Sequence, residues 1–190
     1  MANHVSSYIE FENLSDKSAD WINSFAFNGF GASENKPDPQ TMLPTIYENY
    51  EDSYDFYVDN IGAKWLTFEQ VEDGLIHIVT AWSPAYGFYN RLYEYLHKDS
   101  PDLVMWVRYD DEMPNFVGCF GRSPYGEYEE YLEGDDAYRD AVGDVPSTED
   151  EQGSWEWNDE WYDKLEEWYD KELVFFQEET KELKEKYIDN

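Results

Sequence analysis

Alternating apolar and polar residues around an Asp-Gly pair predict a β-hairpin between Gly62 and Pro84. Both arms, Trp-Leu-Thr-Phe-Glu and Leu-Ile-His-Ile-Val-Thr-Ala-Trp, are rich in β-branched and aromatic residues, and Asp73-Gly74 suits a tight hairpin turn. Neither face of the two arms is strongly polar. We therefore expect this to be the central hairpin of a sheet that is buried on at least one face.

Two helices are predicted, one before and one after the hairpin. The first begins after Ser15, a residue type that caps helix N-termini, and ends near Gly29, which favours a helix stop. The second covers residues 85–97, because Pro84 ends the preceding strand and one face of the following segment is apolar. That face carries Phe88, Leu92, Tyr95 and Leu96.

Further strands are predicted over residues 5–11, 103–109 and 115–121. The element order is then strand, helix, strand, strand, helix, strand, followed by one added strand. This is the split βαβ order, in which an antiparallel sheet carries two helices on one face. We expect an α+β fold of the ferredoxin-like type for residues 1–122.

Residues 29–60 interrupt this order. Their first half is punctuated by glycine and proline, and their second half, from Tyr47 to Asp59, is acidic and aromatic. Roughly thirty residues is longer than a usual connection between two elements. We interpret the segment as an insertion, with a short helix expected at Pro44–Tyr50.

The composition changes after the added strand. Residues 123–190 hold 24 acidic and 6 basic residues, against 20 and 7 in residues 1–122. Residues 123–153 are rich in glycine, proline and acids, and we expect loops and short helices there. From Asn158, apolar residues recur every three or four positions, which predicts a long helix over residues 158–188. The predicted organisation is a ferredoxin-like domain with an acidic C-terminal extension.

The charge of the chain restricts its partners. The 190 residues carry a formal net charge of −31, and an aromatic content of 19% is too high for a disordered acidic chain. So negative a protein would be repelled by nucleic-acid phosphates and by anionic membranes, and it favours a basic protein partner. We see no signal peptide and no apolar window long enough to span a membrane, so we expect a location in the cytoplasm of a host cell.

Short motifs in the predicted domain resemble those of a known family. They are Gly62-Ala63-Lys64-Trp65 and Thr80-Ala81-Trp82-Ser83-Pro84, with Asn3-His4-Val5 and Phe116-Val117-Gly118 fitting the same pattern. Over residues 2–122 the chain resembles the YubB-type ferredoxin-like domain family of plasmid and bacteriophage proteins, with the insertion as a departure. The resemblance implies a mobile-element origin and a fold without an iron–sulfur cluster, which one cysteine could not hold. It brings no catalytic residues.

The residues themselves predict no catalytic or metal site. His4, His77 and His97 lie on different predicted elements, which does not fit the spacing of zinc ligands. Cys119 lies in an apolar run, where a buried hydrophobic role is expected. We therefore expect no catalytic residues, no cofactor and no metal, and we do not expect an enzyme.

Two tryptophans belong to the hairpin. Trp65 and Trp82 are interpreted as buried scaffold residues, because a tryptophan in a strand is more often part of a core than of a surface. Lys64 and Trp65 could instead form a recognition pair.

The leading functional hypothesis is a phage or mobile-element binding protein that acts as a DNA mimic. It would present carboxylates as a duplex presents phosphates, and so inhibit a basic host protein that binds nucleic acid. The partner-binding surface is expected on acids of the extension. These are Glu127, Glu129, Glu130, Glu133, Asp135, Asp136, Glu156, Asp159, Glu160, Asp163, Glu166, Glu167 and Asp170.

Two alternatives stay open on the sequence alone. The chain could be an accessory phage protein whose acidity serves only solubility, or it could hold a small-ligand or enzyme site on the open face of the sheet. Mimicry predicts one elongated acidic patch over residues 123–190, whereas solubility predicts carboxylates on all faces and an enzyme predicts a pocket with convergent polar groups. The C-terminal helix is expected to dock either on its own domain or on a partner, including a second copy in a homodimer.

Overall fold

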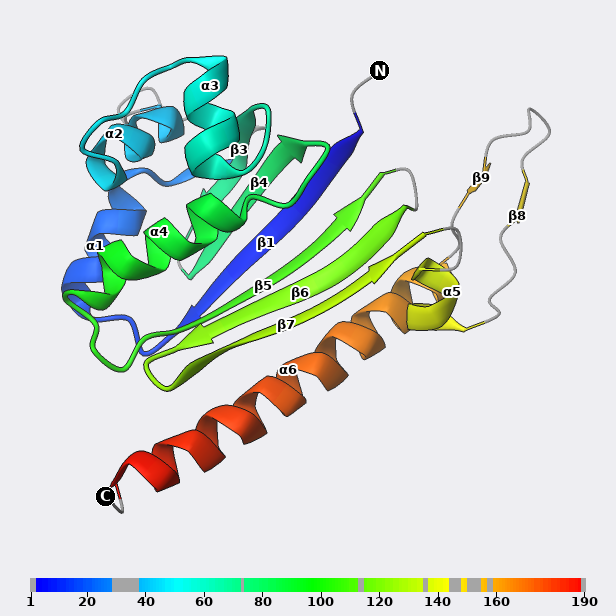
Figure 1. Cartoon of the computed structure of the whole chain (residues 1–190). Helices are drawn as coiled ribbons and strands as arrows, with labels where there is room; N and C mark the ends of the chain where they lie inside the picture. Colours follow the sequence, from blue (N-terminus) through cyan, green and yellow to red (C-terminus); the bar gives the residue numbers. More distant parts are fainter. Residues whose placement is uncertain are drawn as a thin grey trace.

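An antiparallel β-sheet runs through the molecule and carries helices on both of its faces (Figure 1). The computed structural model describes residues 3–28, 38–72, 74–112, 115–134, 137–143, 148–149, 155–156 and 159–188. Among these residues seven strands form the sheet, in the order β2-β3-β4-β1-β5-β6-β7. They are β1 (His4–Glu12), β2 (Phe27–Asn28), β3 (Leu66–Glu72), β4 (Leu75–Ala81), β5 (Val104–Asp111), β6 (Phe116–Ser123) and β7 (Gly126–Glu133).

Helical elements connect and cover these strands. They are α1 (Asp16–Ser24), the 3-10 turn η1 (Pro39–Met42), α2 (Leu43–Ile46), α3 (Tyr54–Phe56), the π-helical turn η2 (Tyr57–Ile61), α4 (Tyr86–His97), α5 (Ala137–Val142) and α6 (Asp159–Ile188). A separate short ladder pairs β8 (Thr148–Glu149) with β9 (Trp155–Glu156). The expected α+β class, the antiparallel sheet and the long C-terminal helix are confirmed.

Helices α1 and α4 cover one face of the sheet, where the larger core lies. Alternate residues of β1, including Val5 and Ile9, point into this core, as the two-residue period of a strand requires. Phe88, Leu92 and Leu96 of α4 meet them there, because a spacing of four residues keeps them on one face of the helix. The predicted second helix is therefore confirmed.

The start of α1 was predicted correctly, and its end was not. The side chain of Ser15 accepts a hydrogen bond from the backbone N–H of Ser18, as a helix N-cap does. The helix ends at Ser24, and the next residues form β2 on the edge of β3. Helical periodicity cannot reveal this pairing with a distant strand. Gly29, the expected stop, lies outside the described residues.

The predicted hairpin exists, but it is not at the centre of the sheet. The central strand is β1, which pairs with β4 on one side and with β5 on the other. Beyond β5, the strands β6 and β7 widen the sheet, so the β3–β4 hairpin lies toward the β2 edge (Figure 1). The strands of the predicted split βαβ unit lie side by side in the order β3-β4-β1-β5.

The described part of the insertion forms short helical segments that pack beside α4. The helix expected at Pro44–Tyr50 is right in place but too long, because α2 ends at Ile46. The insertion approaches α4 most closely at Gly87, where a Cβ atom would lie 2.1 Å from the carbonyl oxygen of Asn60. Only glycine allows this approach, so Gly87 sets how the insertion sits on the helix.

Strand β7 occupies a segment for which we predicted loops and short helices. It pairs with β6 along its whole length, starting with Gly126 opposite Ser123. The prediction was wrong because four of the eight strand positions are glutamates, which disguise Tyr128 and Leu132 on one face of the strand. The extension therefore continues the sheet of the preceding domain.

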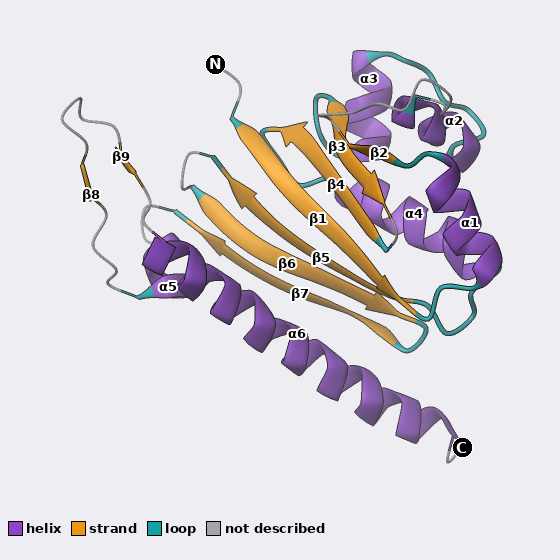
Figure 2. Cartoon of the chain, turned by 180° about the vertical axis from the view of Figure 1, so that it is seen from behind, coloured by secondary structure: helices purple, strands orange, loops and turns teal. Residues whose placement is uncertain are grey.

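Helix α6 packs against the opposite face of the sheet, along β6 and β7 (Figure 2). Its residues Trp161, Leu165 and Phe176 are buried in a second core together with Trp106 and Cys119 of the sheet. The apolar face of α6 thus packs on its own chain, which is one of the arrangements that the sequence left open. A homodimer through this helix stays a prediction.

Candidate functional site

The outward face of α6 carries a row of carboxylates near the start of the helix. Because Trp161, Leu165 and Trp168 turn toward the sheet, the residues between them turn toward solvent. We name these exposed carboxylates the α6 acidic row. Its members are Glu160, Asp163, Glu166, Glu167 and Asp170.

The charge density of the α6 acidic row is close to that of one DNA strand. At 1.5 Å per residue, residues 160–170 span about 15 Å, so neighbouring carboxylates are about 4 Å apart on average along the helix axis. A DNA strand carries one phosphate per about 3.4 Å of axis. Over this length the helix presents negative charge as one strand of a duplex does.

Only part of this charge is neutralised locally. Glu166 forms an ion pair with Arg108, and Glu167 lies 2.7 Å from the ammonium nitrogen of Lys164. The other three members form no ion pair within 4 Å among the residues that the structure describes. Exposed ion pairs contribute little and are screened by salt, so the row remains negative and available to a partner.

The acids of β7 lie on both faces of the sheet. Glu127, Glu129 and Glu133 point to the side of α4, where Glu127 lies 3.2 Å from an arginine of β6 and Glu129 accepts a hydrogen bond of 2.7 Å from the Tyr86 hydroxyl. Glu130 points to the side of α6 and is half-buried. These residues do not continue the α6 acidic row, so a single acidic patch is limited to the helix.

The side chains of the remaining predicted acids lie outside the described part of the structure, and the insertion carries further exposed acids. Of the predicted surface, Asp135 and Asp136 lie outside the described residues, as do the side chains of Glu156 and Asp159. A second group of exposed carboxylates lies on the insertion and was not part of the predicted surface. The acidic and aromatic run of the insertion was the sequence signal that could have identified it. That group comprises Glu48, Glu51, Asp52, Asp55 and Asp59.

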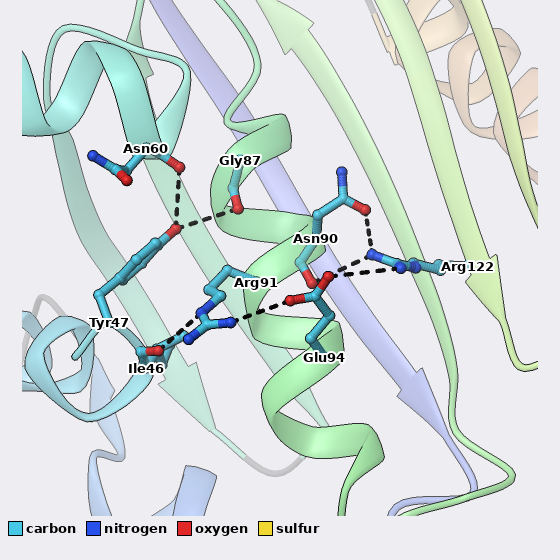
Figure 3. Close-up of polar contacts among 8 residues, drawn as sticks. All are labelled: Ile46, Tyr47, Asn60, Gly87, Asn90, Arg91, Glu94 and Arg122. Atoms are coloured by element: carbon cyan, nitrogen blue, oxygen red, sulfur yellow. Dashed lines mark hydrogen bonds and ion pairs between the residues drawn. The ribbon is translucent and has the colours of Figure 1, made fainter. Parts of the chain in front are cut away.

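A polar cleft of about 520 Å³ lies between the insertion and α4. The Tyr47 hydroxyl lies 3.3 Å from the carbonyl oxygen of Asn60 and 3.2 Å from that of Gly87, so it donates its proton to one of them (Figure 3). Arg91 donates to a carbonyl oxygen at the end of α2 at 3.1 Å and to the carboxylate of Glu94 at 3.3 Å. These bonds fasten the insertion to α4 and form the wall of the cleft.

Arg122 connects this wall to the sheet. It donates hydrogen bonds to the backbone and side-chain oxygens of Asn90, and its guanidinium lies 4.0 Å from Glu94 (Figure 3). The guanidinium also lies 3.2 Å from Glu127. The same group lies 4.8 Å from the ring centroid of Tyr93. The contacts of Arg91 and Arg122 therefore hold the insertion, α4 and the sheet together.

The cleft is lined mainly by carboxylate, amide, guanidinium and phenol groups. Its lining contains no serine, threonine, cysteine, lysine or histidine side chain. Burial raises the pKa of Tyr47 well above its ordinary value of 10, so this hydroxyl stays protonated at neutral pH. A polar ligand could occupy the cleft.

The residues considered for metal or thiol chemistry lie apart. His77 stacks on Tyr8, whereas Cys119 is buried in the second core, where burial raises the pKa of its thiol. Among the described residues no group of three or more histidine, cysteine or acidic side chains is arranged to hold a metal ion. Within the residues that the structure describes, no helix is long and apolar enough to cross a membrane.

Trp82 lies on the surface, so its interpretation as a buried scaffold residue was wrong. Its side chain is 56% exposed, and its backbone φ is +76°, which residues other than glycine rarely adopt. The ammonium nitrogen of Lys64 lies 3.4 Å from the centroid of its ring, whereas Trp65 is half-buried with its ring edge-on to His4. Strand β4 ends at Ala81, one residue before Trp82, so the strand alternation that suggested burial does not extend to Trp82.

The chain matches none of the protein-family models, curated proteins or solved structures with which it was compared. The function is therefore inferred from its own geometry and charge.

Proposed function

We propose that this protein is a DNA mimic that binds a basic, nucleic-acid-binding protein through the α6 acidic row. The observation that supports it is the density of that row, in which neighbouring carboxylates are about 4 Å apart on average along the helix axis. A basic groove that accepts a phosphate backbone would accept such a row. The partner would be attracted over a distance comparable to the Debye length, which is about 10 Å at 0.1 M salt.

The way α6 is held favours this role. Trp161, Trp168 and Phe176 are buried against the sheet, so the backbone that carries the row is fixed before a partner arrives. A fixed surface loses less conformational entropy on binding than a mobile acidic tail. The tryptophans thus give the charges their spacing and leave the outward face for a partner.

The remaining parts of the proposal concern fold and origin. The strand order β3-β4-β1-β5, with α1 and α4 on one face, supports a ferredoxin-like core to which β6, β7 and α6 were added. The resemblance of the hairpin motifs to the YubB-type family supports a phage or mobile-element origin and action in the host cytoplasm. The host protein would then be inhibited because its nucleic-acid site is occupied.

A small-ligand role is a second candidate. It is favoured by the cleft of about 520 Å³ between the insertion and α4, which has the size of many ligand pockets. A fragment screen by NMR tests it. Shifts that cluster on Asn60, Asn90 and Arg91 would support this role, and a screen without such a cluster would oppose it.

The main proposal is tested by capture from a bacterial lysate with two matched variants. The row variant carries Glu160→Gln, Asp163→Asn, Glu167→Gln and Asp170→Asn. The control variant removes the same charge from the insertion, through Glu48→Gln, Glu51→Gln, Asp52→Asn and Asp55→Asn. We expect the wild type and the control to retain a basic protein at about 50 mM salt and to release it at about 500 mM.

The row variant is expected to retain much less of that protein. Equal retention by both variants would contradict the proposal, because it would mean that only total charge matters. Circular dichroism of each variant checks that the helix is intact, since acids near a helix N-terminus stabilise it by about 0.3–1 kcal/mol each.

A further inference from the structure

A groove of about 280 Å³ lies beside α6, on the face of the sheet against which this helix packs. Its floor is formed by side chains of β1 and β5, and one wall is formed by α6. Tyr8 of β1 lies directly opposite His77 of β4 and Arg108 of β5 in the two strand registers. The groove is thus built by residues that only the folded sheet brings together.

The Tyr8 ring is held between its two neighbours. His77 stacks on it with ring centroids 4.2 Å apart and planes within 9° of parallel, and the guanidinium carbon of Arg108 lies 5.1 Å from its centroid. Arg108 also forms the ion pair with Glu166. Tyr8 is therefore fixed in place, and the positive charge of Arg108 is already matched by one carboxylate.

A second carboxylate in the groove has no such partner. The side chain of Asp110 makes no hydrogen bond or ion pair within 4 Å among the described residues, although it lines the groove beside Glu166 and Tyr162. Burial, with a smaller contribution from the charge of Asp111, raises its pKa to about 6. Two carboxylates face one guanidinium in this space, so the groove has an unmatched negative charge.

Aromatic rings beside a carboxylate form a site for an organic cation. A guanidinium or ammonium group gains from the negative face of a tyrosine ring and from a charge-assisted hydrogen bond to a carboxylate. Tyr162 supplies an exposed ring and Asp110 supplies the carboxylate. Tyr8, already covered by His77 and Arg108, forms part of the floor. An anion would meet both carboxylates and the aromatic faces, which would repel it.

We propose that this groove binds the cationic head of an arginine or lysine side chain from the basic partner. Its assignment to the partner rests on the proposed function, because Glu166 belongs both to the groove and to the α6 acidic row. The row attracts the partner over a distance, and the groove fixes one of its side chains. The groove therefore supplies the anchoring contact that exposed charges alone do not give.

Binding of a cation in the groove depends on pH. A cation stabilises charged Asp110, so affinity falls as the pH drops through about 6 and Asp110 takes up a proton. The other titratable or charged groups that act on Asp110 differ in sign and are spread over three elements. They are Arg108 and Asp111 on its own strand, Tyr8 on β1, and Tyr162, Glu166 and Tyr169 on α6.

The test is an NMR titration of the full chain with Nα-acetyl-L-arginine methylamide at pH 7.5 and at pH 5. We expect chemical shift changes centred on Tyr8, Asp110 and Tyr162, and weaker binding at pH 5. Asp110→Asn is expected to weaken binding on the order of tenfold, the loss of one charge-assisted contact. Tyr162→Ala, a change at an exposed site, is expected to weaken it as well.

Matched controls separate this site from general attraction to an acidic protein. Glu178→Gln removes one exposed charge from the same helix away from the groove, and it should leave arginine binding within about twofold of the wild type. Equal losses in Asp110→Asn and Glu178→Gln would overturn the proposal. Binding of spermidine without binding of the arginine probe would overturn the assignment to a side chain and indicate a free polyamine.

The groove and the proposed function can fail separately. If the row variant loses the captured protein and Asp110→Asn neither loses it nor loses the arginine probe, the groove proposal is wrong and the proposed function stands. If arginine binds in the groove and no basic protein is captured through the row, the proposed function is wrong and the groove is a site for a free cation.

Discussion

The ring of Phe176 on α6 stacks on the indole of Trp106 on β5, with ring centroids 5.6 Å apart and planes within 19° of parallel. This contact joins the acidic C-terminal helix to the sheet of the preceding domain. Phe176 is almost completely buried, whereas its neighbour Phe175 is 46% exposed. The pair offers a direct test of how α6 is held.

Replacing Phe176 with alanine is expected to lower the free energy of unfolding by about 3–5 kcal/mol, because a large buried ring leaves a cavity. Phe175→Ala is the matched control and should cost less than about 1 kcal/mol. Urea unfolding monitored by circular dichroism measures both. Similar losses in the two variants would mean that α6 does not pack on the sheet through this face.

Gly121 of β6 lies under the same ring. A Cβ atom at this position would lie 2.8 Å from atoms of the Phe176 ring, closer than ordinary van der Waals contact. Gly121→Ala is therefore expected to destabilise the protein by about 1–3 kcal/mol through overpacking. Combining it with Phe176→Leu should cost less than the sum of the two single changes, and strict additivity in urea unfolding would contradict the contact.

Asp110 is expected to make stability depend on pH. Its pKa in the folded state is about 6, above its ordinary value of 3.8, so the folded state binds the proton more tightly than the unfolded state. The contribution of Asp110 to stability therefore falls as the pH rises from about 4 to about 6, and the full penalty is present above 6.

Asp110→Asn removes this penalty. At pH 8 we expect the variant to be more stable than the wild type by about 1–3 kcal/mol, and at pH 4 we expect little difference. Glu178→Gln, which removes an exposed charge from α6, controls for the general relief of a charge of −31. Urea unfolding at both pH values measures the difference, and an Asp110→Asn variant less stable than wild type at pH 8 would refute this account.

Trp82 is expected to show the reverse of the usual preference for alanine over glycine. At a backbone φ of +76° a Cβ atom is strained, and glycine is not. Both Trp82→Gly and Trp82→Ala lose the contact with Lys64, so their difference isolates the backbone. We expect the glycine variant to be more stable by about 1 kcal/mol in urea unfolding. An alanine variant that is at least as stable would rule out the left-handed conformation.

The sequence predicted best the elements whose pattern is local. The β3–β4 hairpin follows from its alternation and its turn, and α6 follows from apolar residues spaced by three and four. Strand β7 was missed because Glu130 occupies a position on the same face as Tyr128 and Leu132, which breaks the apolar pattern. The position of the hairpin away from the centre could not be predicted, because it depends on strands that follow much later in the chain.

The same distinction between local patterns and long-range pairing applies to the two candidate sites. The exposure of Asp163 and Glu167 follows from helical geometry once Trp161 is known to face a core. The groove could not be predicted, since Tyr8 and Arg108 are one hundred residues apart and meet only through strand register. Local patterns thus identify the charged helix, and long-range pairing builds the site beside it.

The central claim is that the α6 acidic row occupies the DNA-binding site of a basic partner, and competition with DNA tests it most directly. The protein retained from lysate at about 50 mM salt is titrated with a short DNA duplex and, separately, with polyglutamate of equal charge. We expect the duplex to release the partner at a lower concentration than polyglutamate does, and the row variant to retain little partner from the start. Release by both polymers at the same concentration, or undiminished retention by the row variant, would contradict the claim.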